Sequence, residues 1–492
     1  MRNVAVRARG VVWILAAGVV LFAVGAKLAL IHSYGSDQPF ADQWAAEGAT
    51  LFRADLYGRL GWSNFFLPHG EHHPALTRGL AYALFVANGR QWDNRVEAVA
   101  NLTIYAAYLF GLWLVVVRLV AVRWQLPLAG VAALLFGLPA NRENFLWGFQ
   151  SVFLFLLLCG VAHVYGTLRA PRPNWGWAGA QLAGLAGLFS IASGLMSAAT
   201  VGLVAGVGIL RGRRDAWHWA TLAVNVALVG VGLWLLSPYA GAPSEPAPSP
   251  ARVLLSAGHL LSWPLPGPWS CLVIYLPWAA AVIQACREKS AGRACALLFG
   301  LGAWVALMVL AIAYGRGVGP DAIAVRYFDL LTLGLFVNGV AAVRLMAARA
   351  GWRRWAAVAL AAAWAIPLGL SLYQMNRPAE VRPLLAQHRE MTEKQAAAIG
   401  RLMETRDATA LSADDRVRSW FPHLQLTVDL LLDPRMRPLL APSLTADGRA
   451  GPLSRWAPKV AAGWPVLVGF GAALLAAGAV RLLASRRART AA

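Results

Sequence analysis

The chain has 492 residues, of which 58% are hydrophobic and only 14% are charged, and its formal net charge is +21. A mean hydropathy of +0.54 over such a length requires many long apolar runs, which a soluble protein of this size could not bury. The composition therefore excludes a soluble globular enzyme and predicts a polytopic integral membrane protein.

About twelve apolar segments recur along the chain, each close to the ~20 residues that span the hydrocarbon core of a bilayer. We expect helices, because lipid offers no partner to unpaired backbone groups and the segments are too continuously apolar for barrel strands. The predicted spans are 11–31, 96–117, 126–140, 149–168, 175–192, 194–210, 216–236, 268–284, 294–313, 327–343, 355–373 and 460–483. The fifth and sixth require the chain to turn near Ser193, and without that turn the count falls by one. The fold class predicted is an all-α bundle of about 12 transmembrane helices.

Basic residues mark every second boundary between these spans. They are Arg2, Arg7, Arg9, Arg118, Arg123, Arg169, Arg172, Arg211, Arg213, Arg214, Arg287, Lys289, Arg293, Arg349, Arg353, Arg354, Arg486, Arg487 and Arg489. Of the 23 acidic residues, only Asp215 and Glu288 share these loops. The positive-inside rule makes this side cytoplasmic and places both termini there. The charge of +21 is then a topology signal and does not indicate nucleic-acid binding.

Three polar segments fall on the opposite, extracytoplasmic face. The first loop, 32–95, is dense in charged and aromatic residues, and a proline-rich stretch at 237–250 is expected to be an irregular linker. Residues 376–458 contain a helix-like segment at 381–405 and an apolar piece at 424–432, which predict a small subdomain packed on the bundle. The expected division is a transmembrane catalytic bundle with the first loop at 1–375, the subdomain at 376–458, and the last helix with a basic cytoplasmic tail at 459–492.

Candidate functional residues gather where the predicted helices meet the outer face. Asp37 and Asp42 follow the first span by a few residues, at the depth where a lipid-linked substrate presents its head group. Charged groups so close to the hydrocarbon cost a few kcal/mol unless they are paired or hydrated, so they are functional candidates. We expect one outer cavity to hold Asp42, Glu71, His72, Arg78, Glu143 and Arg326.

Several of these segments together resemble bacterial multi-pass glycosyltransferases of the GT-C type. The resemblance rests on the Asp soon after the first span, on Arg326-Tyr327, and on Gly-Glu-His-His-Pro-Ala-Leu-Thr-Arg at 70–78, Glu-Asn-Phe-Leu-Trp-Gly-Phe-Gln at 143–150 and Phe-Ser-Ile-Ala-Ser-Gly-Leu at 189–195. Many members have Asn-Glu-His-Arg where this chain has Gly-Glu-His-His. The resemblance implies a GT-C-like bundle in the bacterial inner membrane. It also implies inverting transfer of a sugar from a polyprenyl-phosphate carrier to a glycan, lipid or protein acceptor of the cell envelope.

That chemistry needs a carboxylate to take the proton from the acceptor hydroxyl and a cationic site for the phosphate leaving group. We assign Asp42 as the base, with Asp37 next and Glu71 as a further catalytic candidate. A guanidinium matches phosphate oxygens with paired donors, so Arg326 and Arg78 are the expected phosphate partners. The remaining residues expected to bind the sugar or acceptor are His72, Glu143, Asn144 and Tyr327. No cofactor is assigned, and a divalent cation that bridges carboxylate and phosphate is an alternative.

Each assignment has a structural competitor. Asp42 could cap an interfacial helix, and Glu143 could pair with Arg142 to close a helix hairpin. Arg326 could anchor the interface by pairing with Asp321 or Asp329. The set His69, His72 and His73 could bind zinc, but a turn next to Pro74 does not hold helical i, i+3, i+4 geometry.

The rival function is a transporter or flippase for a lipid-linked or polar solute, and a third is a non-catalytic accessory protein. A transporter should carry ionisable residues near mid-membrane on several spans, whereas here they collect at one interface and Lys27 is the main exception. The sequence leaves the oligomeric state undetermined.

Overall fold

The computed structural model describes residues 2–170, 172–236, 249–287, 292–316, 323–349, 351–445 and 447–490. Within these ranges the secondary structure is helical, apart from one isolated β-bridge between His69 and His72. Several sequence predictions fall outside the described ranges: residues 237–248 of the predicted linker, Glu288, Lys289 and Asp321.

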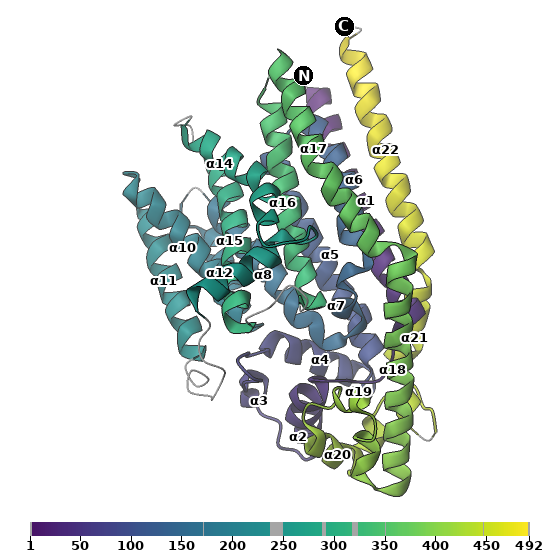
Figure 1. Ribbon diagram of the computed structural model, residues 1–492. Coiled ribbons are helices and arrows are strands. Elements are labelled where there is room, and N and C mark those ends of the chain that lie inside the picture. Colours follow the sequence, from purple (N-terminus) through teal and green to yellow (C-terminus); the bar gives the residue numbers. More distant parts are fainter. Residues whose placement is uncertain are drawn as a thin grey trace.

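Ten described helices are long and apolar enough to cross a membrane, as expected of a multi-pass membrane protein. They lie side by side as one bundle (Figure 1). The ten helices are α1 (Arg2–Tyr34), α5 (Asn94–Leu119), α6 (Val122–Gly137), α8 (Ser151–Arg169), α10 (Leu195–Leu210), α11 (Ala216–Leu236), α15 (Arg293–Arg316), α16 (Phe328–Ala347), α17 (Gly351–Asn376) and α22 (Trp464–Thr490). Helices α6 and α10 reach this length together with the adjoining turns η2 (Pro139–Asn141) and η4 (Ala192–Gly194).

Two of the predicted spans are shorter than expected. The fifth is α9 (Trp175–Leu188), and the chain turns after it through η4 (Ala192–Gly194), as the sequence predicted. The predicted span 268–284 is broken into α13 (Ser270–Ile274) and α14 (Leu276–Arg287), and an unpredicted helix, α12 (Pro250–Ser262), precedes it. Pro277, the second residue of α14, explains the break at Tyr275, because proline removes a backbone donor and clashes with the preceding turn. Prolines at 264, 266 and 268 separate α12 from α13.

The first and last long helices pack closely against each other. A Cβ added at Gly471 of α22 would lie 2.5 Å from the backbone nitrogen of Phe22 on α1, so only glycine permits this approach. In Figure 1 the yellow α22 runs beside α1, and both chain ends lie at the same end of the bundle. This pairing brings the segments that follow α1 and precede α22 to the same place.

The first loop and the segment before α22 fold together at the other end of the bundle (Figure 1). The loop contributes η1 (Trp44–Phe52), α2 (Arg53–Leu56), α3 (Trp62–Phe66) and α4 (Ala75–Ala87). The later segment contributes α18 (Pro378–Thr405), α19 (Asp415–Arg418), α20 (Leu424–Leu432) and α21 (Pro452–Ala462). Helices α18 and α20 match the predicted helical and apolar pieces closely. We call residues 35–93 and 377–463 together the end module.

One hydrophobic core unites the two halves of the end module. It joins Trp44, Phe52 and Trp92 from the loop to Phe421 and Leu430 from the later segment, all of them buried. Hydrogen bonds across the seam add to this packing, because the side-chain amide of Asn88 donates to Ser454 Oγ at 2.9 Å. The predicted subdomain therefore shares its core with the first loop.

Candidate functional site

Asp42 lies where the first loop enters an unusual helix. Ala41, just before it, has a φ of +50°, a left-handed conformation that is uncommon for a residue with a Cβ, and its N–H donates to the Trp420 carbonyl at 3.0 Å. The π-helix η1 begins at Trp44, two residues after Asp42, and π-helical turns occur often at functional sites. The helix is preceded by Gln43, and no side chain caps it. The Asp42 carboxylate therefore does not cap η1, and its side chain is 38% exposed.

A tight turn holds three of the neighbouring polar residues. The backbone N–H of His69 donates to the His72 carbonyl at 2.8 Å, and that of His72 donates to the His69 carbonyl at 3.1 Å. Gly70 takes the left-handed conformation that this two-residue turn requires, with a φ of +54°. As the sequence predicted, the turn precedes α4, whose first residue follows Pro74.

The turn reaches three separate parts of the protein. His69 Nε2 lies 3.5 Å from Asp42 Oδ1. His72 Nδ1 accepts a hydrogen bond from the Ala192 N–H at 3.2 Å, which ties the first loop to the turn between α9 and α10. Glu71 pairs with Arg316 at the end of α15 and lies 3.6 Å from His72 Nε2. The turn thus joins the end module to the bundle.

Charges from distant segments converge on Asp42. Burial opposes ionisation of its carboxyl group, but the hydrogen bond and charge of His69, with the charges of Arg326 and His423, hold its pKa below the usual value. His423 immediately precedes α20, and its ring lies 6.3 Å from the His69 ring. Charges from three parts of the chain therefore act on this carboxylate: the first loop, the turn η7 (Val325–Tyr327) that precedes α16, and the later segment of the end module.

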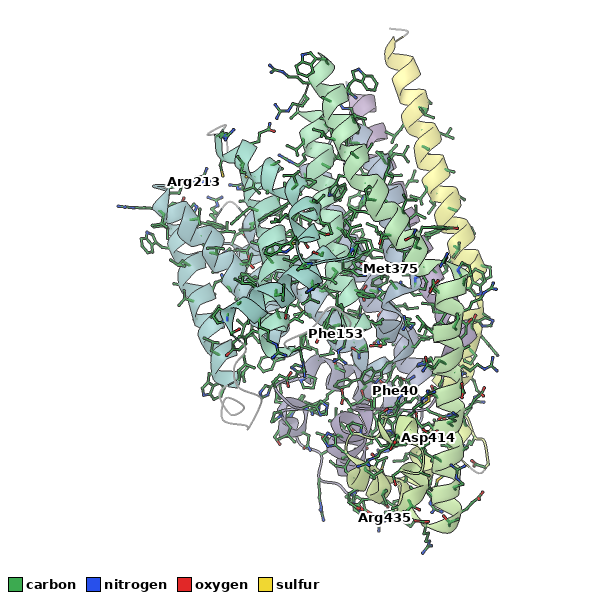
Figure 2. The ribbon with its side chains drawn as sticks, in the orientation of Figure 1. Phe40, Phe153, Arg213, Met375, Asp414 and Arg435 are labelled. Carbon is green, nitrogen blue, oxygen red and sulfur yellow. The ribbon has the colours of Figure 1, made fainter. Side chains whose placement is uncertain are left out.

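Glu143 is a second carboxyl group on which the charge of Arg326 acts. Burial raises the pKa of Glu143, and the charges of Arg326 and Arg142 partly offset that rise. Glu143 also lines a groove of about 330 Å³ between the bundle and the end module. The polar and aromatic side chains that line this groove are Arg142, Glu143, Gln387, His388, Arg416, Ser419 and Trp420. Figure 2 shows Phe40, which stacks on Trp420 with ring centroids 5.0 Å apart, at the junction of bundle and end module.

Asp37 and Arg78 occupy structural positions in the end module. The Asp37 carboxylate accepts hydrogen bonds from the Ser443 N–H at 2.9 Å and from Ser443 Oγ at 2.7 Å, which ties the loop to the later segment. Arg78 is buried, and its guanidinium donates to the backbone carbonyls of Ala46 at 3.0 Å, Phe65 at 3.4 Å and Leu67. These contacts hold the polypeptide around η1 and α3 in place.

Asn144 and Tyr327 support Arg326. The buried Asn144 amide donates to the Arg326 carbonyl at 2.9 Å and to Asp329 Oδ2 at 2.7 Å. Tyr327 is buried, and its ring lies 5.6 Å from the Arg326 guanidinium. The Asp329 carboxylate accepts hydrogen bonds from the side-chain amides of Asn141 and Asn144. Neither Asp329 nor any other described carboxylate forms an ion pair with Arg326.

Sequence reasoning missed His423, Arg316 and the buried Glu47 behind Asp42. His423 and Arg316 are each a single polar residue beside an apolar helix, and only their location on the predicted outer face could have indicated them. Glu47 lies in η1 with no exposed surface and accepts a hydrogen bond from Gln43 Nε2 at 3.1 Å. Nothing in the sequence distinguishes it from an exposed loop carboxylate.

The three histidines that could have formed a zinc site face different partners. His73 contacts the backbone carbonyls of Phe66 at 3.0 Å and Leu235 at 3.2 Å, whereas His69 faces Asp42 and His72 faces Ala192. Among the residues that the structure describes, no three His, Cys, Asp or Glu side chains are grouped to hold a metal ion.

The fold and the site together define a class: an all-helical, multi-pass membrane protein with a polar site between its bundle and its end module. No protein-family model matches the chain, and no curated protein matches it in sequence. Its function must therefore be inferred from the site itself.

Proposed function

We propose that this chain is an inverting membrane glycosyltransferase that moves a sugar from a polyprenyl-phosphate carrier to a glycan, lipid or protein acceptor. The observation that carries the proposal is the accessible Asp42 carboxylate, 3.5 Å from His69 and within the electrostatic reach of Arg326. A partly exposed base beside an arginine that pairs with none of the described carboxylates suits a reaction that removes a proton and releases a phosphate.

The reaction is a single displacement at the anomeric carbon. The acceptor oxygen forms a bond to that carbon while the bond from carbon to the carrier phosphate oxygen breaks, and the acceptor proton moves to Asp42. The lowered pKa of Asp42 keeps it ionised and ready to accept the proton at neutral pH. The carrier leaves as a stable phosphate, so no general acid is required.

Arg326 is the principal phosphate partner in this scheme. Its backbone is fixed by the Asn144 amide, so the guanidinium starts from a defined position. Arg316, which is 46% exposed in its side chain and paired with Glu71, is a better second partner than Arg78, whose donors are directed to backbone carbonyls. Glu71 and His72 then position Arg316 and the turn that carries His69.

The groove lined by Glu143 and Trp420 is the proposed acceptor site. Its polar side chains offer donors and acceptors for hydroxyl groups, and the Trp420 indole offers a flat face against which a sugar ring can pack. Glu143 links the groove to the arginine that would hold the donor phosphate, because Glu143 lines the groove and the charge of Arg326 lowers the pKa of both Glu143 and Asp42.

We further propose twelve membrane crossings, with α9 and the α12–α14 segment as the two shorter ones. Helix α9 has 14 residues and is therefore about 21 Å long, shorter than the ~30 Å hydrocarbon core of a bilayer. The residues that lead to the turn at Ser193 would complete its crossing. The basic boundaries then face the cytoplasm, and the end module with its site faces the extracytoplasmic side of a bacterial inner membrane.

The test is transfer by the purified protein from a panel of polyprenyl-phosphate sugars. Asp42→Asn should lower turnover by roughly 10²- to 10⁴-fold, the usual contribution of a general base. Asp429→Asn is the matched control, because Asp429 is an exposed carboxylate in the same module that accepts from Gln425 at 2.9 Å. Full activity in Asp42→Asn would show that another group is the base.

One observation favours the transporter alternative. Lys27 is fully buried within α1, and its amine donates to Asn141 Oδ1 at 2.6 Å and to the Leu138 carbonyl. Ionisable groups inside a membrane span often mark a translocation path. The same preparation should therefore be reconstituted in liposomes, where movement of a lipid-linked solute without any sugar transfer would replace the enzyme with a flippase.

A further inference from the structure

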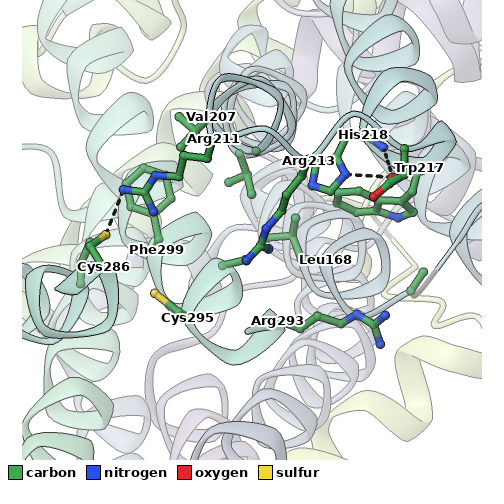
Figure 3. A pocket seen from close by; sticks show the side chains of 16 residues that line it. Leu168, Val207, Arg211, Arg213, Trp217, His218, Cys286, Arg293, Cys295 and Phe299 are labelled. Atoms are coloured by element: carbon green, nitrogen blue, oxygen red, sulfur yellow. Dashed lines mark hydrogen bonds and ion pairs between the residues drawn. The ribbon is translucent and has the colours of Figure 1, made fainter. Parts of the chain in front are cut away.

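A second cavity, of about 490 Å³, lies at the end of the bundle opposite the Asp42 site. Figure 2 shows Arg213, which lines it, far from Phe40 and the end module. Its inner wall is apolar and consists of Leu168, Val204, Val207, Val282, Ala296 and Phe299. Its rim carries Arg211, Arg213 and Arg293, drawn in Figure 3. The cavity is thus amphipathic, with cationic groups above a hydrocarbon-like wall.

The loop that carries two of these arginines is held in a defined shape. Helix α10 ends in a Schellman motif, in which the Arg213 N–H donates to the Gly208 carbonyl at 2.9 Å and the Gly212 N–H to the Ile209 carbonyl at 2.9 Å. Gly212 has the positive φ that this motif requires, +85°. Arg211 and Arg213 therefore flank a fixed glycine.

Neighbouring side chains fix the rest of the rim. The Arg211 guanidinium donates to Cys286 Sγ at 3.3 Å and so bridges α10 and α14 (Figure 3). Among the described residues that line the cavity, the one carboxylate is Asp215, which accepts hydrogen bonds from the His218 backbone N–H at 3.1 Å and ring Nδ1 at 2.9 Å. Arg293 opens α15, whose N-terminal turn adds the partial positive charge of a helix dipole.

We propose that this cavity binds one anionic phospholipid, with its phosphate among the rim arginines and an acyl chain along the Val204 and Phe299 wall. Arginines placed at the membrane interface bind phosphate by paired donors, and basic pockets between transmembrane helices bind anionic lipid head groups. The apolar wall favours a lipid over free phosphate, because only a lipid covers it. The proposal concerns the opposite end of the molecule and does not depend on the glycosyltransferase assignment.

The test is titration of the delipidated, full-length protein in dodecyl maltoside, with bound lipid counted by native mass spectrometry. Dioleoyl-phosphatidylglycerol should bind with one high-affinity molecule per chain, ahead of dioleoyl-phosphatidylcholine and inorganic phosphate. The double substitution Arg211→Ala and Arg293→Ala should weaken that site about thirtyfold, from a contribution of about 1 kcal/mol per arginine. The control is Arg353→Ala, an exposed arginine at the same end of the bundle that does not line the cavity and should leave binding unchanged.

A second variant separates the cavity from surface charge. Val204→Trp fills the apolar wall, keeps every arginine, and should abolish the single high-affinity lipid. Each variant is melted in lipid-free detergent, and an unchanged midpoint establishes that the fold is intact. Equal loss of binding in Arg353→Ala, full binding by Val204→Trp, or binding of inorganic phosphate as tight as that of phosphatidylglycerol would each overturn the proposal.

Discussion

The substitution Glu47→Gln should remove a pH dependence of stability that originates behind the candidate site. Glu47 is fully buried, and its Oε2 accepts hydrogen bonds from Gln43 Nε2 at 3.1 Å and Trp92 Nε1 at 3.2 Å. The same Gln43 amide donates to Glu97 at 3.0 Å, so two buried carboxyl groups share one donor. Burial raises the pKa of Glu47 from 4.5 to about 7.

The sign and size of the effect follow from this raised pKa. A carboxyl group whose pKa is higher in the folded than in the unfolded protein stabilises the fold fully at a pH below its pKa in the unfolded protein. This contribution is lost as the pH rises through its pKa in the folded protein. For Glu47 that window runs from 4.5 to about 7. At roughly 1.4 kcal/mol per pH unit, the folded state loses about 3 kcal/mol of its free energy of unfolding across it.

Thermal unfolding in detergent, followed by tryptophan fluorescence from pH 5 to pH 8, measures this loss. The wild-type midpoint should fall as the pH rises, and Glu47→Gln should flatten the curve because the amide is neutral throughout. Glu404→Gln, an exposed position at the end of α18, should keep the wild-type slope. A Glu47→Gln protein that retains the full slope would refute the reasoning, since the titrating group would then lie elsewhere.

Three further outcomes are expected. Phe421→Ala should cost about 3 to 5 kcal/mol in the free energy of unfolding, because the ring is 2% exposed in the shared core, and a melt with an unchanged midpoint would contradict one joint core. Arg78→Ala should lower the melting midpoint, because leaving the backbone carbonyls unsatisfied costs about 3 kcal/mol in the free energy of unfolding. The KM for the sugar donor should stay unchanged. A raised KM with normal stability would instead identify Arg78 as a phosphate ligand. His69→Ala should raise the pKa of Asp42 and move the acid limb of kcat/KM to higher pH, whereas an unmoved limb would separate His69 from the base.

The sequence predicted those features of the fold that depend on local composition. Ten predicted spans correspond to long apolar helices because hydropathy alone decides them, and α18 and α20 followed from helical spacing and an apolar run. The broken segment 250–287 was predicted poorly, since Pro277 was counted inside one continuous span, 268–284, and α12 was not predicted. No residue composition distinguishes a π-helix from an α-helix, so the sequence of η1 predicts only an ordinary interfacial helix.

The candidate site was predicted only in its residue types. Asp42 was singled out from its place after the first span, but its partner His423 comes from the far end of the chain, and no local pattern connects the two. Arg78 and Asn144 have the chemistry of ligand-binding residues, yet burial directs their donors to the protein itself. A residue type indicates what a side chain can bind, whereas burial determines what it does bind.

The pairing of the first and last helices explains why so distant residues form one site. Helix α1 leads directly into the first loop, and α21 and α22 close the segment that carries His423. Since α1 and α22 approach closely at Gly471, both polar segments leave the bundle at neighbouring points. The shared core and the tie between Asp37 and Ser443 then fix one segment against the other. Neither the first loop nor the later segment could complete the surroundings of Asp42 alone, so contacts within the helical bundle determine the geometry of a site at its end.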